Sequence, residues 1–382
     1  MIGWQAVALG DVLTRASDWV ALDPDADYKQ VTIRLWGKGV VLRGAVKGSA
    51  IAAKQQLRVK SGQFIMSKID ARNGAFGLVP DDLDAAVVSQ DFPMFSIDEK
   101  RMLPGFMAWM SKTDWFVALC RAASEGSTNR VRLKEDRFLA QSVQLPSVEE
   151  QLRIVMHLDK AASLLENGQR RAEEVENELK ATLSKTFSCL IAHAPRAKMR
   201  DVAPLVRRQV AIDLDKKYPE LGVRSFGRGL FVKPTLVGSE LTWQKLFLIK
   251  NGDLVFSNIK AWEGAFAVAR SEHDEKVGSH RYLTCVVDPS KTTPDFLFFY
   301  LQTQEGLEQI QAASPGSADR NRTLGQTGLE EIEVPVPPLA RQQWFDGLQT
   351  KAADMRTRNK EAEAELRLLI PSMLHRAFRK GF

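Results

Sequence analysis

Basic residues and glycines recur at one spacing in two halves of the 382-residue sequence. Arg34-x-x-Gly37-x-Gly39 returns 190 residues later as Arg224-x-x-Gly227-x-Gly229, and Gly74-Ala75-Phe76 returns as Gly264-Ala265-Phe266. A long internal repeat predicts two copies of one structural unit. Cations at fixed places in both copies are suited to binding a polyanion, because phosphates neutralised by a protein release their counterions. Two similar surfaces in one chain are suited to a target that also has two halves.

Positive charge is concentrated in the same part of each copy. Val31–Arg72 holds nine Lys or Arg residues and one acid, Asp70, although the net charge of the whole chain is only +6. The corresponding stretch, Leu221–Trp262, holds six basic residues and two acids. This distribution predicts a nucleic acid, such as double-stranded DNA, as a partner. The alternative is a well-solvated basic face with no ligand.

Thirteen basic residues are candidates for DNA contacts: Arg34, Lys38, Arg43, Lys68, Arg72, Arg130, Arg132, Arg224, Arg228, Lys233, Lys260, Arg320 and Arg322. Arginine is the expected base reader, because its fork matches guanine O6 and N7, whereas lysine more often positions phosphate. Gly37-x-Gly39 and its mate either let the backbone approach DNA or form plain tight turns. Ser124–Ser127 either grips phosphate with the arginines that follow it or ends the preceding helix.

No residues have the spacing of a catalytic or metal site, so we predict neither. The tetrapeptide [DNS]PP[YFW] and the FxGxG loop of amino-methyltransferases are absent, and Gly37-Lys38-Gly39 lacks the span of a P-loop. The five histidines show no metal-ligand spacing. Cys120 and Cys285 are expected to be core thiols, and three cysteines without a CxxC pair argue against a disulfide framework. With no signal segment or membrane-spanning run, we expect a cytoplasmic protein.

Each copy is predicted to have a globular module followed by a long helix. The expected boundaries are 1–147 and 195–339 for the modules, and 148–194 and 340–382 for the helices. Short β-type runs such as Gln63–Ile69 and Leu254–Ile259 alternate with Gly, Pro, Asn and Asp, and a helix is expected over Pro104–Ala123 and over its mate Pro294–Ala312. The modules are therefore expected to be α+β, with a curved sheet.

The two long helices carry heptad patterns. The seam positions in the first helix are Leu158, Ala161, Leu165, Gly168, Ala172, Val175 and Leu179. Those in the second are Leu348, Ala352, Met355, Asn359, Ala362, Leu366, Leu369 and Met373. Neither helix could hide its apolar stripe alone, so we expect an antiparallel coiled coil.

Together these features resemble the specificity subunit of type I restriction–modification systems, HsdS. The resemblance covers the whole chain, with Ser61–Ser67 and Asn251–Ser257 as matching motifs. The small-residue turns Gly126-Ser127-Thr128 and Gly316-Ser317-Ala318 match as well. So do the sequences that begin the long helices, Gln144–Val155 and Val334–Gln343, which follow a form close to PLPPLxEQxxIV. The second copy differs from it in Ala340-Arg341 and Trp344-Phe345, and the first in Pro146-Ser147.

The resemblance implies two target-recognition domains, each of which reads one half of a bipartite DNA sequence. It implies that the coiled coil between them acts as a ruler and as a dock for two methyltransferase subunits. Those subunits would use S-adenosylmethionine to methylate adenine N6, and motor-nuclease subunits would join them to cut unmodified DNA. This chain would hold no cofactor and would be non-catalytic.

Two other classes of function fit parts of the sequence. One is a stand-alone DNA-binding scaffold or repressor without a methyltransferase partner. The other is a coiled-coil structural protein whose basic faces are incidental. A neighbouring methyltransferase gene would favour the specificity subunit, and a lack of salt-sensitive DNA binding would favour the structural protein.

Overall fold

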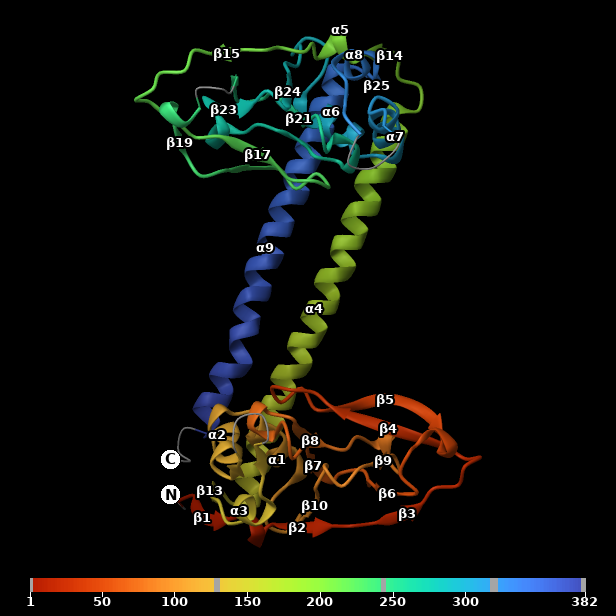
Figure 1. The fold of residues 1–382 in the computed structure, drawn as a ribbon, viewed down its shortest axis with the longest axis vertical. Helices are drawn as coiled ribbons and strands as arrows, with labels where there is room; N and C mark the ends of the chain where they lie inside the picture. Colours follow the sequence, from red (N-terminus) through yellow and green to blue (C-terminus); the bar gives the residue numbers. More distant parts are fainter. Residues whose placement is uncertain (1–2, 127–130, 242–244, 317–321, 379–382) are drawn as a thin grey trace. The chain divides into compact units, whose positions relative to one another are not determined.

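The computed structural model describes residues 3–126, 131–241, 245–316 and 322–378 (Figure 1). The chain divides into two compact units. Unit 1 comprises Met1–Ala172 and Lys360–Phe382, and unit 2 comprises Glu173–Asn359. Each long helix therefore contributes one segment to each unit. In the described part of the chain, none of the helices combines the length and the apolar character that a membrane crossing needs.

Unit 1 is built around two sheets, whose strand pairs are antiparallel except for β4 and β9, which pair in parallel within the second sheet. The first has the order β2 (Leu13–Ala16), β10 (Met94–Ile97), β7 (Phe64–Met66) and β8 (Phe76–Leu78). The second has the order β3 (Trp19–Ala21), β6 (Gln55–Arg58), β9 (Val87–Val88), β4 (Asp27–Ile33) and β5 (Val40–Lys47). Two pairs complete the unit: β1 (Gln5–Ala8) with β13 (Ser142–Leu145), and β11 (Ser124–Glu125) with β12 (Arg132–Leu133).

Unit 2 repeats the central part of this arrangement. Its sheets are β22 (Phe266–Val268), β21 (Leu254–Ser257) and β24 (Tyr282–Cys285), and β15 (Gln209–Val210), β20 (Leu246–Ile249) and β23 (Lys276–Ser279). The pairs are β14 (Arg196–Lys198) with β25 (Glu333–Pro335), β16 (Lys217–Tyr218) with β19 (Leu236–Val237), and β17 (Leu221–Val223) with β18 (Leu230–Val232).

The repeated strand motif forms the centre of each unit. In β7, Phe64 and Met66 face one apolar core, whereas Ile65 faces another. In β21, Phe256 and Val255 divide between two cores in the same way. Successive side chains of a strand point to opposite faces, so a strand buried on both faces is apolar throughout. The strands expected over Gln63–Ile69 and Leu254–Ile259 are thus confirmed, with shorter bounds.

The helix expected over Pro104–Ala123 is two helices, α1 (Pro104–Ser111) and α2 (Asp114–Ala122). Its mate is likewise divided into α6 (Pro294–Leu301) and α7 (Gln304–Ala312). A threonine begins the second helix of each pair: Thr113 Oγ1 accepts a hydrogen bond from the Phe116 N–H, and Thr303 does the same for Gly306. Such an N-cap starts a new helix instead of continuing the old one. The shorter helices are α3 (Glu135–Leu139), α5 (Met199–Val202) and α8 (Gln326–Glu331).

The long helices α4 (Val148–Ile191) and α9 (Leu339–Phe378) are continuous over 44 and 40 residues. A fully buried glutamine fixes the start of each to its unit. Gln151 Nε2 donates to the Arg101 and Pro146 carbonyls, and Gln342 Nε2 donates to the Lys291 and Pro337 carbonyls. The glutamine of the helix-start motif therefore satisfies buried backbone groups in both copies.

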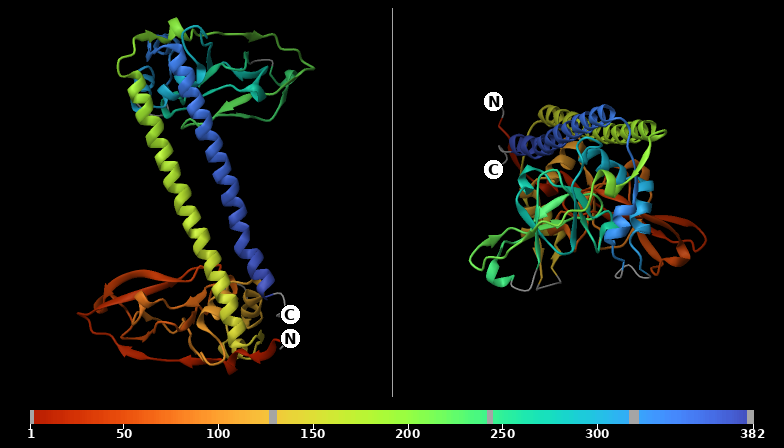
Figure 2. Two further views of the ribbon diagram at one scale, coloured as in Figure 1. Left: turned by 180° about the vertical axis from the view of Figure 1, so that it is seen from behind. Right: turned by 90° about the horizontal axis from the view of Figure 1, so that it is seen from above.

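In each unit, the C-terminal end of one long helix packs on the N-terminal segment of the globular helix pair. Phe378 of α9 lies 5.2 Å from Phe106 of α1, measured between ring centroids. Phe187 of α4 lies 5.0 Å from Phe296 of α6. The repeat relates these contacts, and all four rings are almost fully buried. The C-terminal end of each long helix lies against the globular part of its unit (Figure 2), and its phenylalanine belongs to the core there.

Within each unit the segments of α4 and α9 are antiparallel, as predicted. In unit 2, Phe187 lies 5.2 Å from Phe345, and Glu176 pairs with Arg356. In unit 1, Leu158 and Leu374 share one core, and a Cβ on Gly168 would lie 3.4 Å from Leu366 Cδ1. The predicted seam of α4 is buried or half-buried at every position from Leu158 to Leu179.

The seam of α9 differs from the heptad prediction at three of its eight positions. Met355 and Leu369 are 47% and 38% exposed, and Ala362 is exposed as well. The half-buried residues are instead their C-terminal neighbours Arg356, Glu363 and Ile370. The other five predicted positions are buried or half-buried as predicted: Leu348, Ala352, Asn359, Leu366 and Met373.

A polar contact explains why the apolar pattern failed at Met355. Arg356 Nε lies 2.8 Å from Glu176 Oε2 of α4, and both side chains are about one third exposed. The hydrogen bond from Arg356 lowers the pKa of Glu176. A long side chain can bury its methylene stem in a seam while its charge stays paired, which a search for apolar residues cannot detect.

The observed seam of α9 can be tested by measuring the stability of two alanine variants. Ile370 packs against the core of unit 1, whereas the adjacent Leu369 does not belong to that core. We predict that Ile370→Ala lowers the free energy of unfolding by about 1–3 kcal/mol. The matched control Leu369→Ala should change it by no more than about 0.5–1 kcal/mol, as is usual for exposed positions. Denaturant titration measures both, and equal losses would contradict the observed seam.

Candidate nucleic-acid interface

The basic repeat motif forms a tight hairpin turn in each unit, here called the hairpin tip (residues 34–39 and 224–229). In unit 1 it joins β4 to β5, and the Arg34 N–H donates to the Gly39 carbonyl at 2.9 Å. In unit 2 it joins β17 to β18, and Arg224 and Gly229 make the same bond at 3.0 Å. Both closing glycines have positive φ, 81° and 84°. Of the two interpretations of Gly-x-Gly, the tight turn is therefore present.

Each hairpin tip is fastened to a second repeated turn, a 3-10 helix: η3 (Ala71–Asn73) in unit 1 and η7 (Ala261–Glu263) in unit 2. The Gly37 N–H donates to the Gly74 carbonyl, and the Gly227 N–H donates to the Gly264 carbonyl, both at 2.9 Å. The preceding residue of each tip, Trp36 or Phe226, also donates its N–H to a carbonyl of this turn.

Gly74 is required at this junction for two reasons. Its φ is 80°, a left-handed conformation that side chains disfavour. In addition, a Cβ at this position would lie 3.0 Å from the backbone N and Cα of Trp36. The glycine of the Gly-Ala-Phe motif thus lets two backbones meet, and this contact sets the position of the hairpin tip.

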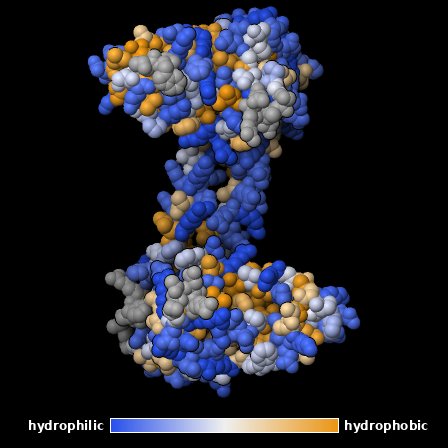
Figure 3. Space-filling view, viewed as in Figure 1, coloured by the Kyte–Doolittle hydropathy of each residue, from blue (hydrophilic) through white to orange (hydrophobic). Residues whose placement is uncertain are grey.

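An exposed aromatic residue occupies the same place in both hairpin tips. Trp36 is 66% exposed and Phe226 is 71% exposed. Their φ angles are 61° and 62°, so both residues have left-handed backbones. A bulky residue in this region carries strain of order 1–3 kcal/mol, which the surrounding hydrogen bonds must offset. The same hairpin also carries two exposed leucines, Leu35 in the tip and Leu42 in β5. Figure 3 shows hydrophobic residues gathered over the strands of unit 1.

The candidate cations of unit 1 fall into two groups. Arg34, Lys38 and Arg43 are exposed and make no ion pair within the described residues, whereas Arg72 is half-buried. Lys68 Nζ lies 2.9 Å from Glu135 Oε1, and Arg132 Nη1 lies 2.6 Å from Asp91 Oδ1. Lys68 and Arg132 are therefore neutralised by carboxylates of their own unit.

The candidate cations of unit 2 divide in the same way. Arg224 and Arg228 are exposed, and their guanidinium groups lie 4.6 and 5.6 Å from the rings of Phe231 and Phe226. Lys233 pairs with Glu220 at 2.8 Å and Lys260 with Glu263 at 2.7 Å. Arg322 is half-buried and lies over the Trp262 ring. Arg130 and Arg320 lie outside the described residues.

Ion pairing shifts the pKa of one member of each lysine pair in unit 2. Burial by itself would lower the pKa of Lys233, but the hydrogen bonds and charges of Glu220 and Tyr282 together outweigh burial and raise the pKa. The hydrogen bond from Lys260 lowers the pKa of Glu263. The shifts of Lys233 and Glu263 both favour the charged form, and a phosphate must compete with a carboxylate for each lysine.

Three groups near the hairpin tips were missed by the sequence analysis. Two are Trp36 and Phe226, each of which directly precedes a glycine of the repeated motif. Their common aromatic character was the signal that could have identified them. The third is Arg121 of α2, whose Nε donates to the Arg72 carbonyl at 2.9 Å. Its counterpart, Gln311, donates to the Trp262 carbonyl, so only the tertiary contact reveals this role.

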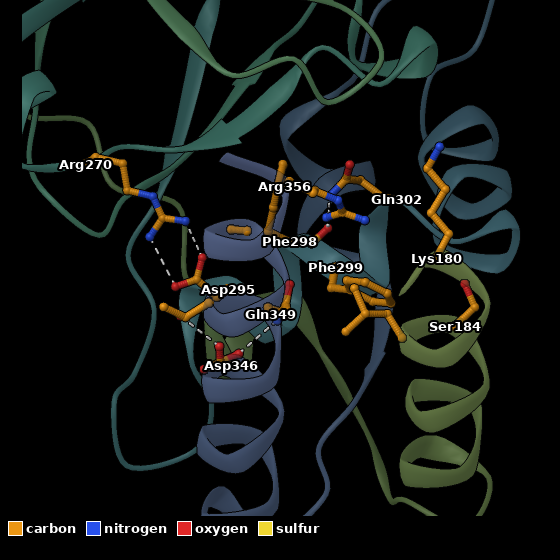
Figure 4. Close-up of a pocket in the computed structure, with 13 residues that line it drawn as sticks. Lys180, Ser184, Arg270, Asp295, Phe298, Phe299, Gln302, Asp346, Gln349 and Arg356 are labelled. Atoms are coloured by element: carbon orange, nitrogen blue, oxygen red, sulfur yellow. Dashed lines mark hydrogen bonds and ion pairs between the residues drawn. The ribbon is translucent and has the colours of Figure 1, made fainter. Parts of the chain in front are cut away.

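A separate cavity of about 520 Å³ lies in unit 2 between the globular helices and the long helices (Figure 4). Arg270 and Asp295 form a two-pronged ion pair there, with one contact of 3.1 Å. Burial raises the pKa of Asp346, whose Oδ1 accepts a hydrogen bond from Gln349. Arg270 and Asp295 are thus paired with each other, and Asp346 is hydrogen-bonded by Gln349. Among the described residues that line the cavity, no hydrogen bond joins a nucleophilic side chain to a general base.

The described residues give no indication of metal or thiol chemistry. Among them, no group of three or more His, Cys, Asp or Glu side chains is placed to hold a metal ion. Cys120 and Cys285 are buried, as predicted. Burial raises the pKa of Cys285 to about 12 and that of Cys120 further, so both thiols stay protonated.

Two solved structures resemble the chain over nearly its whole length. The HsdS subunit from Thermoanaerobacter tengcongensis is 18% identical, has a TM-score of 0.64, and the match covers 99% of this chain and 97% of that one. A chain from a structure on the complex assembly and conformational transition of the type I R-M system is 18% identical, with a TM-score of 0.69. That match covers 99% of this chain and 98% of the other.

No family model and no curated protein matches the sequence. At this identity the structural likeness establishes the fold. The mixed α/β architecture with two long helices, which the repeated motifs predicted, is therefore confirmed.

The backbone contact of the hairpin tip can be tested with two glycines of similar φ. Gly62 has φ 77° and no atom within 4 Å of a Cβ, whereas Gly74 has φ 80° and the Trp36 backbone at 3.0 Å. We predict that Gly62→Ala lowers the free energy of unfolding by roughly 1 kcal/mol, the cost of a left-handed alanine. Gly74→Ala should lower it by at least about twice as much. Equal losses in denaturant titrations would show that the contact adds nothing.

Proposed function

We propose that this chain is the DNA specificity subunit of a type I restriction–modification complex. The observation that carries the proposal is the pair of hairpin tips, which present an exposed aromatic between cations in both units. The fold supports it, because the similar solved structures include an HsdS subunit. A binding protein with two equivalent basic sites is suited to a DNA target with two half-sites.

In this proposal each hairpin tip enters a groove of its half-site. Arg34 and Arg43 in unit 1 and Arg224 and Arg228 in unit 2 read base edges, because they are exposed and make no ion pair among the described residues. Lys38 positions phosphate. Lys68, Arg132, Lys233 and Lys260 contribute less, because each is engaged by a carboxylate. Arg72 and Arg322, which are half-buried, and Arg130 and Arg320 remain candidates on sequence alone.

The two half-sites are expected to differ in sequence. The strand that follows the hairpin tip in unit 1 is β5, with Val40–Lys47, whereas its counterpart β18 has only Leu230–Val232. The segments 42–56 and 233–244 have little sequence in common. Side chains on these segments would therefore meet different base edges, although the tips themselves are alike.

The long helices offer surfaces for the methyltransferase subunits. Leu152, Met156 and Leu164 of α4 in unit 1 are exposed, as is Trp344 of α9 in unit 2. Exposed apolar side chains on a charged helix indicate a protein partner more than DNA. We propose that two modification subunits dock here, one to each unit.

In the assembled complex the partners would perform the chemistry. The methyltransferase subunits would bind S-adenosylmethionine and flip an adenine out of the stack, and motor-nuclease subunits would join for cleavage. This chain would hold no cofactor and would only fix the register of the complex on DNA. Such an assembly acts on DNA in the cytoplasm.

Methylation mapping tests the function directly. Genomic DNA from cells with the chain and its neighbouring methyltransferase gene should carry N6-methyladenine in one bipartite motif. Deletion of the chain alone should abolish that methylation, while the methyltransferase stays present. Unchanged methylation after the deletion would contradict the proposal.

The assignment of the free and paired cations is testable by DNA binding. We predict that Arg34→Ala relaxes one base position of one half-site and costs about 1–3 kcal/mol there, and that Arg224→Ala does the same at the other half-site. Lys68→Ala is the matched control, and it should weaken binding by less than about 1 kcal/mol, equally on all sequences. Permuted duplexes at fixed salt measure the losses. A uniform loss for both arginines would reassign them to phosphate contacts.

A further inference from the structure

We propose that Trp36 and Phe226 are a pair of aromatic wedges, one in each unit, that insert between neighbouring base pairs of duplex DNA. The inference rests on the proposed function and specifies how each hairpin tip engages its half-site. Both side chains are more than 60% exposed, although large aromatics are usually buried in a folded domain. Their recurrence at the same place in two otherwise divergent units indicates a shared task.

The backbone of each wedge is held rigidly in a conformation that the residue itself disfavours. Trp36 and Phe226 have φ angles of 61° and 62°. The Trp36 N–H donates to the Asn73 carbonyl and the Phe226 N–H to the Glu263 carbonyl, both at 2.9 Å. Strain that the surroundings maintain is a feature of functional sites. Here it directs an aromatic ring outward, where it contributes little to the core.

The charges around the wedges select nucleic acid over a protein partner. Arg34 and Lys38 flank Trp36 at two residues on either side, and Arg224 and Arg228 flank Phe226 in the same way. Neither hairpin tip contains an acid. The guanidinium group of Arg228 lies 5.6 Å from the Phe226 ring, so cation and ring reach outward together. Cations on two sides of an apolar wedge match the phosphates on two sides of an opened base step.

The difference between the two wedges also fits stacking. Trp and Phe present different shapes and hydrogen-bonding groups, so they could not make one common specific contact. Both offer a π-face, and stacking on a base depends only on that face. An inserted ring unstacks the step and bends the duplex, which brings more of the protein into contact with its half-site.

The test uses the complex of this chain with its methyltransferase subunits and duplexes of the mapped motif. A 2-aminopurine probe is placed in turn at each base step of the half-sites, apart from the target adenines, so that base flipping does not contribute. In the wild-type complex, fluorescence should rise at one step in each half-site. Trp36→Ala should abolish the rise at one half-site only and weaken binding roughly tenfold. Phe226→Ala should do the same at the other.

Three variants separate the wedge from general effects. Trp36→Phe keeps a π-face and should retain most of the fluorescence rise. Trp36→Gly relieves the backbone strain, so the melting temperature of this variant should be no lower than that of the wild type. The variant should still lose the fluorescence rise. Trp19→Ala removes another tryptophan of unit 1, which is 53% exposed on β3, and should change nothing.

The outcomes distinguish the inference from the function on which it rests. If the wild-type complex prefers the bipartite duplex but shows no unstacked step, or if Trp36→Ala and Phe226→Ala behave as wild type, the wedge is refuted and the specificity function stands. If loss of either ring impairs assembly with the methyltransferase instead of DNA binding, the ring is a protein contact and the wedge is refuted. If the wild-type complex does not distinguish the bipartite duplex from a scrambled one, the proposed function itself fails.

Discussion

The close backbone contact between the hairpin tip and the glycine turn is the constraint on which the candidate interface depends. At Gly74 in unit 1, no side chain fits between the two backbones. The hydrogen bonds from residues 36 and 37 to this turn exist only because the chains approach so closely. The contact fixes the aromatic ring outward and places the cations of the tip beside it. The same contact recurs at Gly264 in unit 2.

The positive charge of the repeats is not equally available to a ligand. Several lysines and arginines that raise the net charge are bound to carboxylates far away in sequence, such as Lys68 to Glu135 and Lys233 to Glu220. The side chains of these two pairs are only 11–31% exposed, so each cation is held within its own unit. The cations at the hairpin tips have no such partners among the described residues. Local pairing therefore concentrates the usable charge at the tips.

The long helices contribute side chains to the cores of the units and also pack against each other within each unit. Each begins with a buried glutamine that bonds the carbonyls of its own unit, and each ends with a phenylalanine in an aromatic cluster. Because α4 and α9 each contribute segments to both units, unit 1 is encoded by two separate stretches of sequence, whereas unit 2 is the single stretch between them. Loss of a helix end would therefore remove part of a core, not merely a linker.

Much of the architecture was determined by the sequence itself. The repeat predicted two units of one kind, the proline and heptad patterns predicted the helices, and the buried strands followed from runs such as Phe64–Met66. These features are local or periodic, so they can be recognised without knowing which residues meet. The seam of α4 was predicted for the same reason.

Only the tertiary structure decided which side chains occupy the seam of α9, which cations form ion pairs and which aromatic residue is exposed. The pairing of Arg356 with Glu176 moved the seam of α9 away from Met355, because a paired charge can occupy a seam position that apolar periodicity assigns to its neighbour. Lys68 and Arg34 look alike in the sequence, yet only Lys68 meets a carboxylate, 67 residues further along the chain. The exposure of Trp36 likewise depends on a left-handed backbone that a distant glycine turn enforces. Each of these outcomes depends on contacts between distant segments, which local sequence patterns do not specify.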